Sequence, residues 1–247
     1  MIDLFCGVLI GIVMGLTGAG GALIAIPLFM QFMGQSLKEA SLYSLVAVVV
    51  ASLLNFFAQK SFTQYRIGAA IVVSSAIASY LTVPFKENLS SFWIAILLSA
   101  ISLYALYTVW FPLRIKNDSV KSHQSLWVSL VIGLILGTLT TFTGLGGGVL
   151  MLPVLLGIYR FSQPQAVATS LFAVGLSSLS SLIIQIYKGA EFEFGKGFLF
   201  LLLGILSAVV ILKKYTHHLK ADFVVKLRQI VFSVVVIIAL SKIFQQA

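Results

Sequence analysis

The chain has 247 residues, of which 60% are hydrophobic and only 9% are charged, and its mean hydropathy is +1.08. An average soluble domain carries about 25% charged residues, so this composition leaves too little polar surface for a water-exposed globule and predicts an integral membrane protein. The net charge of +9 comes from short gaps between apolar runs, without a basic stripe or a nucleic-acid motif, so we expect a lipid-bilayer environment and no nucleic-acid partner. Cys6 is the only cysteine, which excludes a disulfide scaffold.

Charge-free stretches predict the membrane segments in chain order. They are residues 4–37, 40–59, 67–85, 88–113, 122–159, 161–187, 197–212 and 229–241. Most of these stretches fit one spanning helix each, because a span needs about 20 residues. The last reaches that length if it begins near Phe223 and its basic residues extend toward the interface.

Two stretches, 4–37 and 122–159, are too long for one ordinary span, and glycines interrupt both in the middle. Each stretch therefore predicts two short helices, about 4–16 with 22–33 and 125–141 with 148–159. A helix of about 12 residues rises only about 18 Å, which is less than the hydrocarbon core of about 30 Å. We therefore expect the glycine turns to lie within the membrane, where irregular backbone must be buried in protein or line a cavity.

The two glycine segments are one motif used twice, at an offset of 126 residues. The copies read Thr17-Gly18-Ala19-Gly20-Gly21 and Thr143-Gly144-Leu145-Gly146-Gly147. The same offset pairs Gly11 with Gly137, Ser36 with Ser162, Ser44 with Ser170, Ser52 with Ser178, and Gln59 with Gln185. Matched glycine, serine and glutamine at one offset are unlike chance similarity between apolar segments. The sequence predicts two membrane repeats, 1–113 and 125–247, joined by a cytoplasmic linker at 114–124.

Lysine and arginine decide between two topologies. If each long stretch crosses the membrane once, the 16 basic residues divide evenly between the two sides. If each long stretch enters and returns, one side holds five of them: Lys38, Lys86, Lys188, Lys196 and Lys242. The positive-inside rule prefers the second model. Five segments per half then make the repeats inverted, with both termini outside and the loops around 60–66, 114–124 and 213–222 in the cytoplasm. We expect an all-α polytopic membrane protein of two inverted repeats, with short broken or re-entrant helices at the glycine motifs.

The glycine motifs are the strongest candidates for a binding site, because no Asp or Glu lies inside a predicted span to bind a cation. A helix N-terminus offers free N–H groups and about half a positive charge, and glycine permits the backbone of an anion nest. The expected substrate-binding residues here are Thr17, Gly18, Gly20, Gly21, Thr143, Gly144, Gly146, Gly147 and Gly148. The alternative is that the glycines only allow close helix packing.

Polar residues also form one stripe on each of the two helices that follow the motifs. The stripes are Ser44, Ser52, Asn55 and Gln59, and Ser170, Ser178, Ser181 and Gln185. Polar groups facing lipid are costly, so we expect both stripes to face inward, either lining a pathway or joining helices by hydrogen bonds. Amide N–H groups suit the oxygen atoms of a sulfonate, and the candidate contacts are Ser52, Asn55, Gln59, Ser178 and Gln185.

The motif T-G-x-G-G-x-x-x-x-x-P, which occurs once in each half, resembles that of the TauE/SafE sulfite-exporter family, over essentially the whole chain. The first copy has Ala22 where the second has Gly148. The resemblance implies transport of a small sulfur-containing anion, such as sulfite, an organosulfonate, sulfoacetate or thiosulfate, across the bacterial inner membrane.

No enzyme is expected, because the glycine motifs lack the third glycine of a dinucleotide fingerprint and the Gly-Lys-Ser/Thr of a P-loop. We expect no catalytic residue, metal or cofactor. The expected function is secondary transport, with substrate held at helix N-termini near the midplane. An anion channel and a non-transporting membrane subunit are the alternatives.

Overall fold

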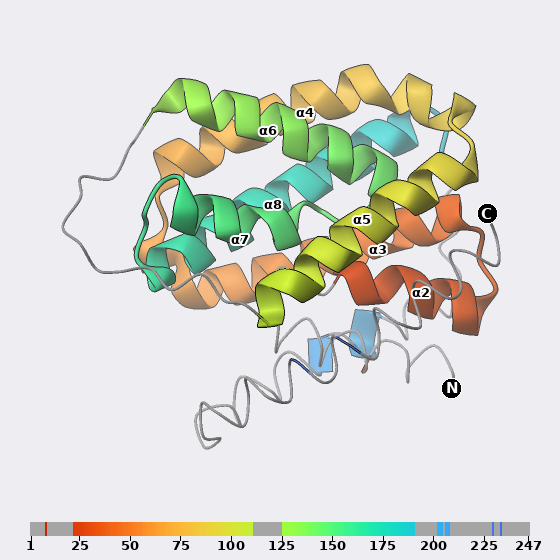
Figure 1. Ribbon diagram of the computed structural model, residues 1–247, viewed down its shortest axis with the longest axis horizontal. Coiled ribbons are helices and arrows are strands. Elements are labelled where there is room, and N and C mark those ends of the chain that lie inside the picture. The colour runs from red at the N-terminus through yellow and green to blue at the C-terminus, as the bar shows by residue number, and fades with distance from the viewer. Residues whose placement is uncertain are drawn as a thin grey trace.

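The computed structural model describes residues 22–110 and 125–190, with isolated positions at 8, 202–204, 206, 207, 229 and 233. Its elements are α2 (Ala22–Met33), α3 (Leu37–Gln59), η2 (Lys60–Phe62), α4 (Tyr65–Asn88), α5 (Ser91–Trp110), α6 (Leu126–Thr143), α7 (Gly148–Gly157) and α8 (Gln163–Tyr187) (Figure 1). This described part of the chain has helices and no strand, which confirms the predicted all-α class. The helices α3, α4, α5, α6 and α8 are each long and apolar enough to cross a membrane.

A capping box begins each of the two long helices α3 and α8. Before α3, the Ser36 hydroxyl accepts from the Glu39 N–H at 3.3 Å, and Glu39 Oε2 accepts from the Ser36 N–H at 2.8 Å. Before α8, Ser162 and Gln165 form the same box, in which Gln165 Oε1 accepts from the Ser162 N–H at 3.2 Å. These bonds satisfy N–H groups that every helix leaves free at its start. The first box also explains why α3 begins at Leu37, three residues before the charge-free stretch 40–59.

The stretch 122–159 folds as a helical hairpin rather than as one span. Helix α6 ends at Thr143, the N–H of its C-cap residue Gly144 donates to Thr140 O at 2.8 Å, and α7 begins at Gly148. The Tyr159 hydroxyl, just beyond α7, lies 2.7 Å from Ser129 Oγ near the start of α6. The end of α7 has therefore returned to the end of the bundle where α6 begins (Figure 1). This confirms the two predicted short helices, with only small changes at their bounds.

Helix α8 runs in the same direction as α4. At one end the Gln64 N–H, just before α4, donates to Thr169 Oγ1 at 3.0 Å, and at the other end Lys86 Nζ donates to Gln185 Oε1 at 2.7 Å. The first contact joins the N-terminal ends of the two helices, and the second joins their C-terminal ends. The two helices are therefore parallel neighbours.

Helix α8 runs opposite to α3. The Phe56 ring near the end of α3 lies 5.3 Å from the Phe172 ring in the first half of α8. Near the middle of both helices, a Cβ on Gly175 would lie 3.4 Å from Ser52 Cβ. The register of these contacts makes α3 and α8 an antiparallel pair.

Small residues bring α6 and α4 into close contact. A Cβ on Gly133 would lie 2.5 Å from Ile71 O, and one on Gly137 would lie 2.5 Å from Ser75 O. Glycine at these positions allows the two backbones to approach, as small residues do between membrane helices. The residue numbers of the contacts increase in the same direction along both helices, from Gly133 with Ile71 to Gly137 with Ser75. Helix α6 is therefore parallel to α4, and hence also to α8.

The described basic residues divide between the two ends of this bundle. Lys60, Arg66 and Arg160 lie at the end where α4 and α8 begin, and Lys38, Lys86 and Lys188 lie at the end where those helices finish. The single-crossing topology would have placed Arg160 with Lys38 and Lys86. The stretch 122–159 thus has the returning arrangement that the charge distribution favours.

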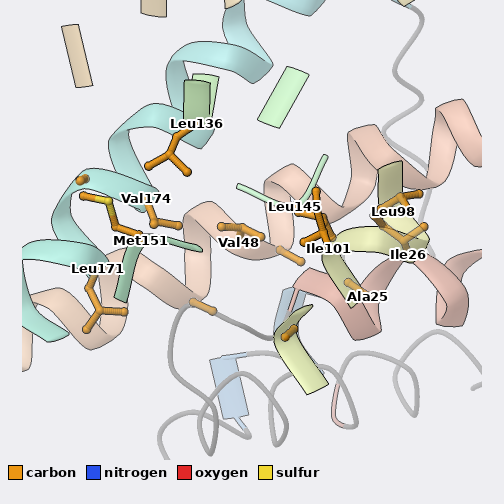
Figure 2. Packing of buried hydrophobic residues seen from close by; sticks show 14 of the residues in the cluster. Ala25, Ile26, Val48, Leu98, Ile101, Leu136, Leu145, Met151, Leu171 and Val174 are labelled. Carbon is orange, nitrogen blue, oxygen red and sulfur yellow. The ribbon is translucent and has the colours of Figure 1, made fainter. Parts of the chain in front are cut away.

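The hydrophobic core surrounds α7 and the turn before it. Met151 is fully buried and Leu145, within the turn, is 2% exposed. Val48 of α3, Val174 of α8 and Leu145 are seen together with other core residues in Figure 2. The outer faces of the helices instead expose large apolar side chains: Phe85, Trp93, Tyr107 and Trp127 are each more than half exposed. An apolar exterior of this kind suits a lipid surround.

Candidate functional site

The break between α6 and α7 is a glycine turn buried within the protein. Gly144 and Gly146 have φ of +72° and +66°. A residue with a side chain pays about 1–2 kcal/mol to adopt this left-handed conformation. A Cβ on Gly146 would also lie only 2.5 Å from Ser178 Oγ and 2.7 Å from Val48 Cγ1. Both the conformation and the space at this turn therefore require glycine.

The turn extends from near the start of α3, where Gly144 packs against Ser41, to middle depth in the bundle at Gly146. Gly146 packs against Val48, the central residue of α3, and against Ser178, one turn from the centre of α8. Irregular backbone at this depth is buried by protein, as the sequence predicts.

Thr143 stabilises the turn. Its hydroxyl donates to Leu139 O at 2.6 Å and accepts from the Leu145 N–H at 3.3 Å. The Gly147 carbonyl accepts the first helical bonds of α7, from the N–H groups of Leu150 and Met151 at 3.1 and 3.0 Å. Thr143 is fully buried and satisfies one donor that the break leaves free.

Other donors around the turn remain available. Among the described residues, the N–H groups of Gly148 and Val149 at the start of α7 have no acceptor. The hydroxyls of Ser178 and Ser52 are buried and likewise have no hydrogen-bond partner in the described structure. Buried polar groups are nearly always paired, so each such hydroxyl requires an explanation. Ser178 faces Gly146, which places this hydroxyl beside the turn.

Ser44 has a different role from its stripe neighbours. Its Oγ lies 2.7 Å from Gly144 O and 2.8 Å from Ser41 O, and its single proton is shared between these carbonyls. The Ser41 backbone in turn packs on Gly144, where a Cβ would lie 2.7 Å from Ser41 Cα. Ser44 therefore joins α3 to the glycine turn.

The remaining residues of the two stripes differ in burial. Ser170 donates to Val167 O of its own helix at 3.1 Å, and Asn55 Nδ2 donates to Ala51 O at 2.9 Å. Ser170 is buried, whereas Asn55 and Gln59 are half-buried. The stripe on α8 faces inward along its whole length, as predicted, and the stripe on α3 becomes more open toward Gln59.

Gln185 lies in a polar cluster that also contains a lysine. Lys86 Nζ donates to Gln185 Oε1 at 2.7 Å and to Ser41 Oγ at 2.9 Å. Gln185 Nε2 donates onward to Ser181 Oγ at 3.1 Å. Lys86 is 7% exposed and Gln185 is 2% exposed. We call Lys86, Ser41, Gln185 and Ser181 the Lys86 cluster.

The buried position of Lys86 corrects the sequence analysis, which assigned every cation to a gap between spans. The charge-free stretch 67–85 stops one residue short of Lys86, while α4 continues to Asn88 and its part that is long and apolar enough to cross a membrane is Tyr65–Lys86. A helical signal was available, because Lys86 follows the buried residues Ser75 and Ser79 at spacings of 11 and 7. The helix N-termini are therefore not the only source of positive potential inside the bundle.

The first glycine motif lies outside the described residues. Nothing is described at Thr17, Gly18, Gly20 or Gly21. Helix α2, which follows them, leads toward the end of the bundle where α3 begins, whereas α7 leads toward the opposite end (Figure 1). The two short helices therefore run in opposite directions.

A small hollow adjoins the second turn and has room for about one water molecule. Its lining residues are Ile101, Leu139, Thr143, Leu145, Gly147, Val149 and Leu150. Beside this hollow, Gly148 at the start of α7 is buried and Val149 is half-buried.

Apolar helices of this length around a buried helix break define a polytopic α-helical membrane protein. The sulfite exporter TauE/SafE family matches residues 4–241, and the chain belongs to this family. The probable membrane transporter YunE of Bacillus subtilis is 26% identical over 74% of this chain and 77% of its own length. The probable membrane transporter MJ0441 of Methanocaldococcus jannaschii is 23% identical over 83% of this chain and 80% of its own length. A probable membrane transporter of Xylella fastidiosa is 25% identical over 68% of this chain.

No solved structure matches the chain. The family and these relatives together indicate a membrane transporter.

Proposed function

We propose that this chain is a secondary transporter of small sulfur-containing anions, such as sulfite, organosulfonate, sulfoacetate or thiosulfate. The observation that carries the proposal is the start of α7, where the N–H groups of buried Gly148 and half-buried Val149 and the buried Ser178 hydroxyl lack described partners. A helix N-terminus carries about half a positive charge and readily binds oxyanions. An anion held there would satisfy donors that the fold otherwise leaves unpaired.

The first glycine motif would supply the other half of this site. Thr17, Gly18, Gly20 and Gly21 match the second motif position for position. Two facing helix N-termini would provide about one unit of positive charge, which balances a monoanion. Asn55 and Gln59 on the half-buried part of α3 are then candidate lining residues of the route to the site.

The proposed architecture is a pair of inverted repeats, 1–113 and 125–247. Three observations support it: the capping boxes at Ser36 and Ser162, the opposite directions of α2 and α7, and the antiparallel pairing of α3 with α8. A twofold axis in the membrane plane relates equivalent helices in opposite directions, as is seen for α3 and α8. Rocking of such halves about a midplane site is a recurring transporter mechanism.

The proposed orientation places the Arg160 end of the bundle in the cytoplasm of a bacterium and both termini outside. Its support is the excess of basic residues in the loops assigned to that end.

Flux through liposomes that contain the purified protein tests the proposal. We expect saturable uptake of at least one of sulfite, thiosulfate and sulfoacetate, accelerated when the same anion is present on the other side. Taurine, sulfate, chloride and acetate serve as comparisons. Unsaturable anion conductance without this exchange would identify a channel. No flux and no binding of sulfur anions by folded protein would favour a non-transporting subunit.

A further inference from the structure

Lys86 is a buried cation whose described partners are all neutral. It lies near the end of α4, between α3 and α8, and donates to Ser41 Oγ and Gln185 Oε1. Among the described side chains no carboxylate lies within ion-pair distance of its Nζ, and its charged neighbour is Lys38, a like charge. Its third proton has no acceptor in the described part of the chain.

An uncompensated charge at this position is costly. Burial removes the hydration of the ammonium group, and hydrogen bonds to a hydroxyl and an amide do not neutralise it. The C-terminal end of α4 offsets only part of the charge, because a helix end carries about half a unit. An anion is the ligand that would complete this environment.

The Lys86 cluster is continuous with the glycine turn. Ser41, which accepts from Lys86, packs its backbone on Gly144, and Ser44 joins both. On α8, Ser178 lies beside Gly146, and Ser181 and Gln185 follow it at helical spacing. Gln185 Oε1 accepts from Lys86 Nζ, and Gln185 Nε2 donates to Ser181 Oγ. Polar groups thus connect the buried lysine to the start of α7.

We propose that Lys86 is the charged ligand of an anion station on the transport route, where oxygen atoms of the substrate replace Gln185 as acceptors for its N–H groups. This inference rests on the proposed function and adds a full cationic ligand to it. The exchange would loosen a contact between the two proposed repeats, because Lys86 and Gln185 belong to different ones. The expected ligand is an oxyanion. Both a dissolved substrate and a phospholipid headgroup could supply one.

Thermal unfolding of the full-length protein in neutral detergent tests the station, with sulfite, thiosulfate and sulfate as probes. Lys86→Gln removes the charge, Lys86→Arg keeps it, and Lys188→Gln removes an exposed lysine that lies 4.5 Å above the Tyr80 ring at the same end. We expect Lys86→Gln to raise the apparent Kd for the stabilising sulfur anion at least tenfold. Lys188→Gln should respond as the wild type does, and Lys86→Arg should keep part of the response.

The melting temperature without ligand separates this role from a purely structural one. Without added anion, Lys86→Gln should unfold at the same or a higher temperature than wild type, because it removes an uncompensated buried charge. Gln185→Glu is a second test that keeps the lysine. Its carboxylate should pair with Lys86, raise the basal melting temperature and abolish the anion response.

Each other outcome has a defined meaning. A folded Lys86→Gln that binds sulfur anions as wild type does would overturn the station and leave the proposed function intact. A lower basal melting temperature with an unchanged anion response would make Lys86 a structural link only. A Lys86-dependent shift with short-chain phosphatidylglycerol but not with sulfur anions would assign the cluster to a lipid headgroup. Absence of any sulfur-anion response in the wild type would overturn both the station and the proposed function.

Discussion

The hydroxyl of Ser44 lies 2.7 Å from the carbonyl of Gly144, so a serine of α3 holds the backbone at the point where α6 breaks. This bond crosses 100 residues of sequence and joins the two predicted repeats. It also places the second glycine turn in a fixed position against α3. The turn is therefore held by specific contacts, and its free donors are presented on a rigid frame.

Ser44→Ala should destabilise the protein because it removes the donor to a buried carbonyl. We expect a loss of about 1 kcal/mol, the usual net contribution of such a bond, and slower transport. Ser170→Ala is the matched control, since Ser170 is the repeat-equivalent serine and bonds only Val167 O of its own helix among the described contacts. Thermal unfolding and flux of the two variants measure the difference. Equal melting temperatures would show that the Ser44–Gly144 bond does not hold the turn.

Ser178→Ala should separate binding from stability. Its hydroxyl is buried without a described partner, so its removal should leave the unfolding free energy unchanged or raise it by about 1 kcal/mol. Anion affinity should fall, because the hydroxyl beside Gly146 is a proposed substrate donor. Ser177→Ala is the control, since the Ser177 hydroxyl is also buried and unpartnered in the described structure but is not a proposed ligand. Equal anion binding by both variants would remove Ser178 from the site.

The returning topology predicts which side of the membrane each loop faces. In a Cys6→Ser background, cysteines at the exposed positions Arg66 and Arg160 should react with an impermeant thiol reagent from the cytoplasmic side. A cysteine at Lys188 should react from the outer side. Labelling of Arg160→Cys and Arg66→Cys from opposite sides would contradict the returning hairpin of α6 and α7.

The sequence predicted the helix break because its signal is local. Glycines in the middle of an overlong apolar stretch place the break between α6 and α7 to within two residues. Periodicity likewise predicted that Ser178 and Gln185 face inward.

The sequence could not predict which polar groups meet across helices. Ser44 and Ser52 share one predicted face, yet the first bonds the turn and the second has no described partner. The sequence predicts that Lys86 lies in a gap between spans because each predicted span ends at a charged residue, whereas packing against α3 and α8 buries this lysine beside Gln185. Contacts between helices depend on which helices are neighbours and on their register. The spacing of polar residues along one helix determines neither.

We propose that a sulfur-containing anion binds at the glycine turn before α7. Its most direct test is equilibrium binding of sulfite, thiosulfate and sulfoacetate to purified wild type, Gly146→Ala and Gly157→Ala. A methyl group at Gly146 would lie too close to Ser178 Oγ, and the positive φ of Gly146 disfavours any side chain. A methyl group at Gly157 would have no atom within 4 Å. We expect wild type and Gly157→Ala to bind at least one of these anions equally, and folded Gly146→Ala to bind it at least tenfold more weakly. Binding by Gly146→Ala that equals binding by the wild type would contradict an anion site at this turn.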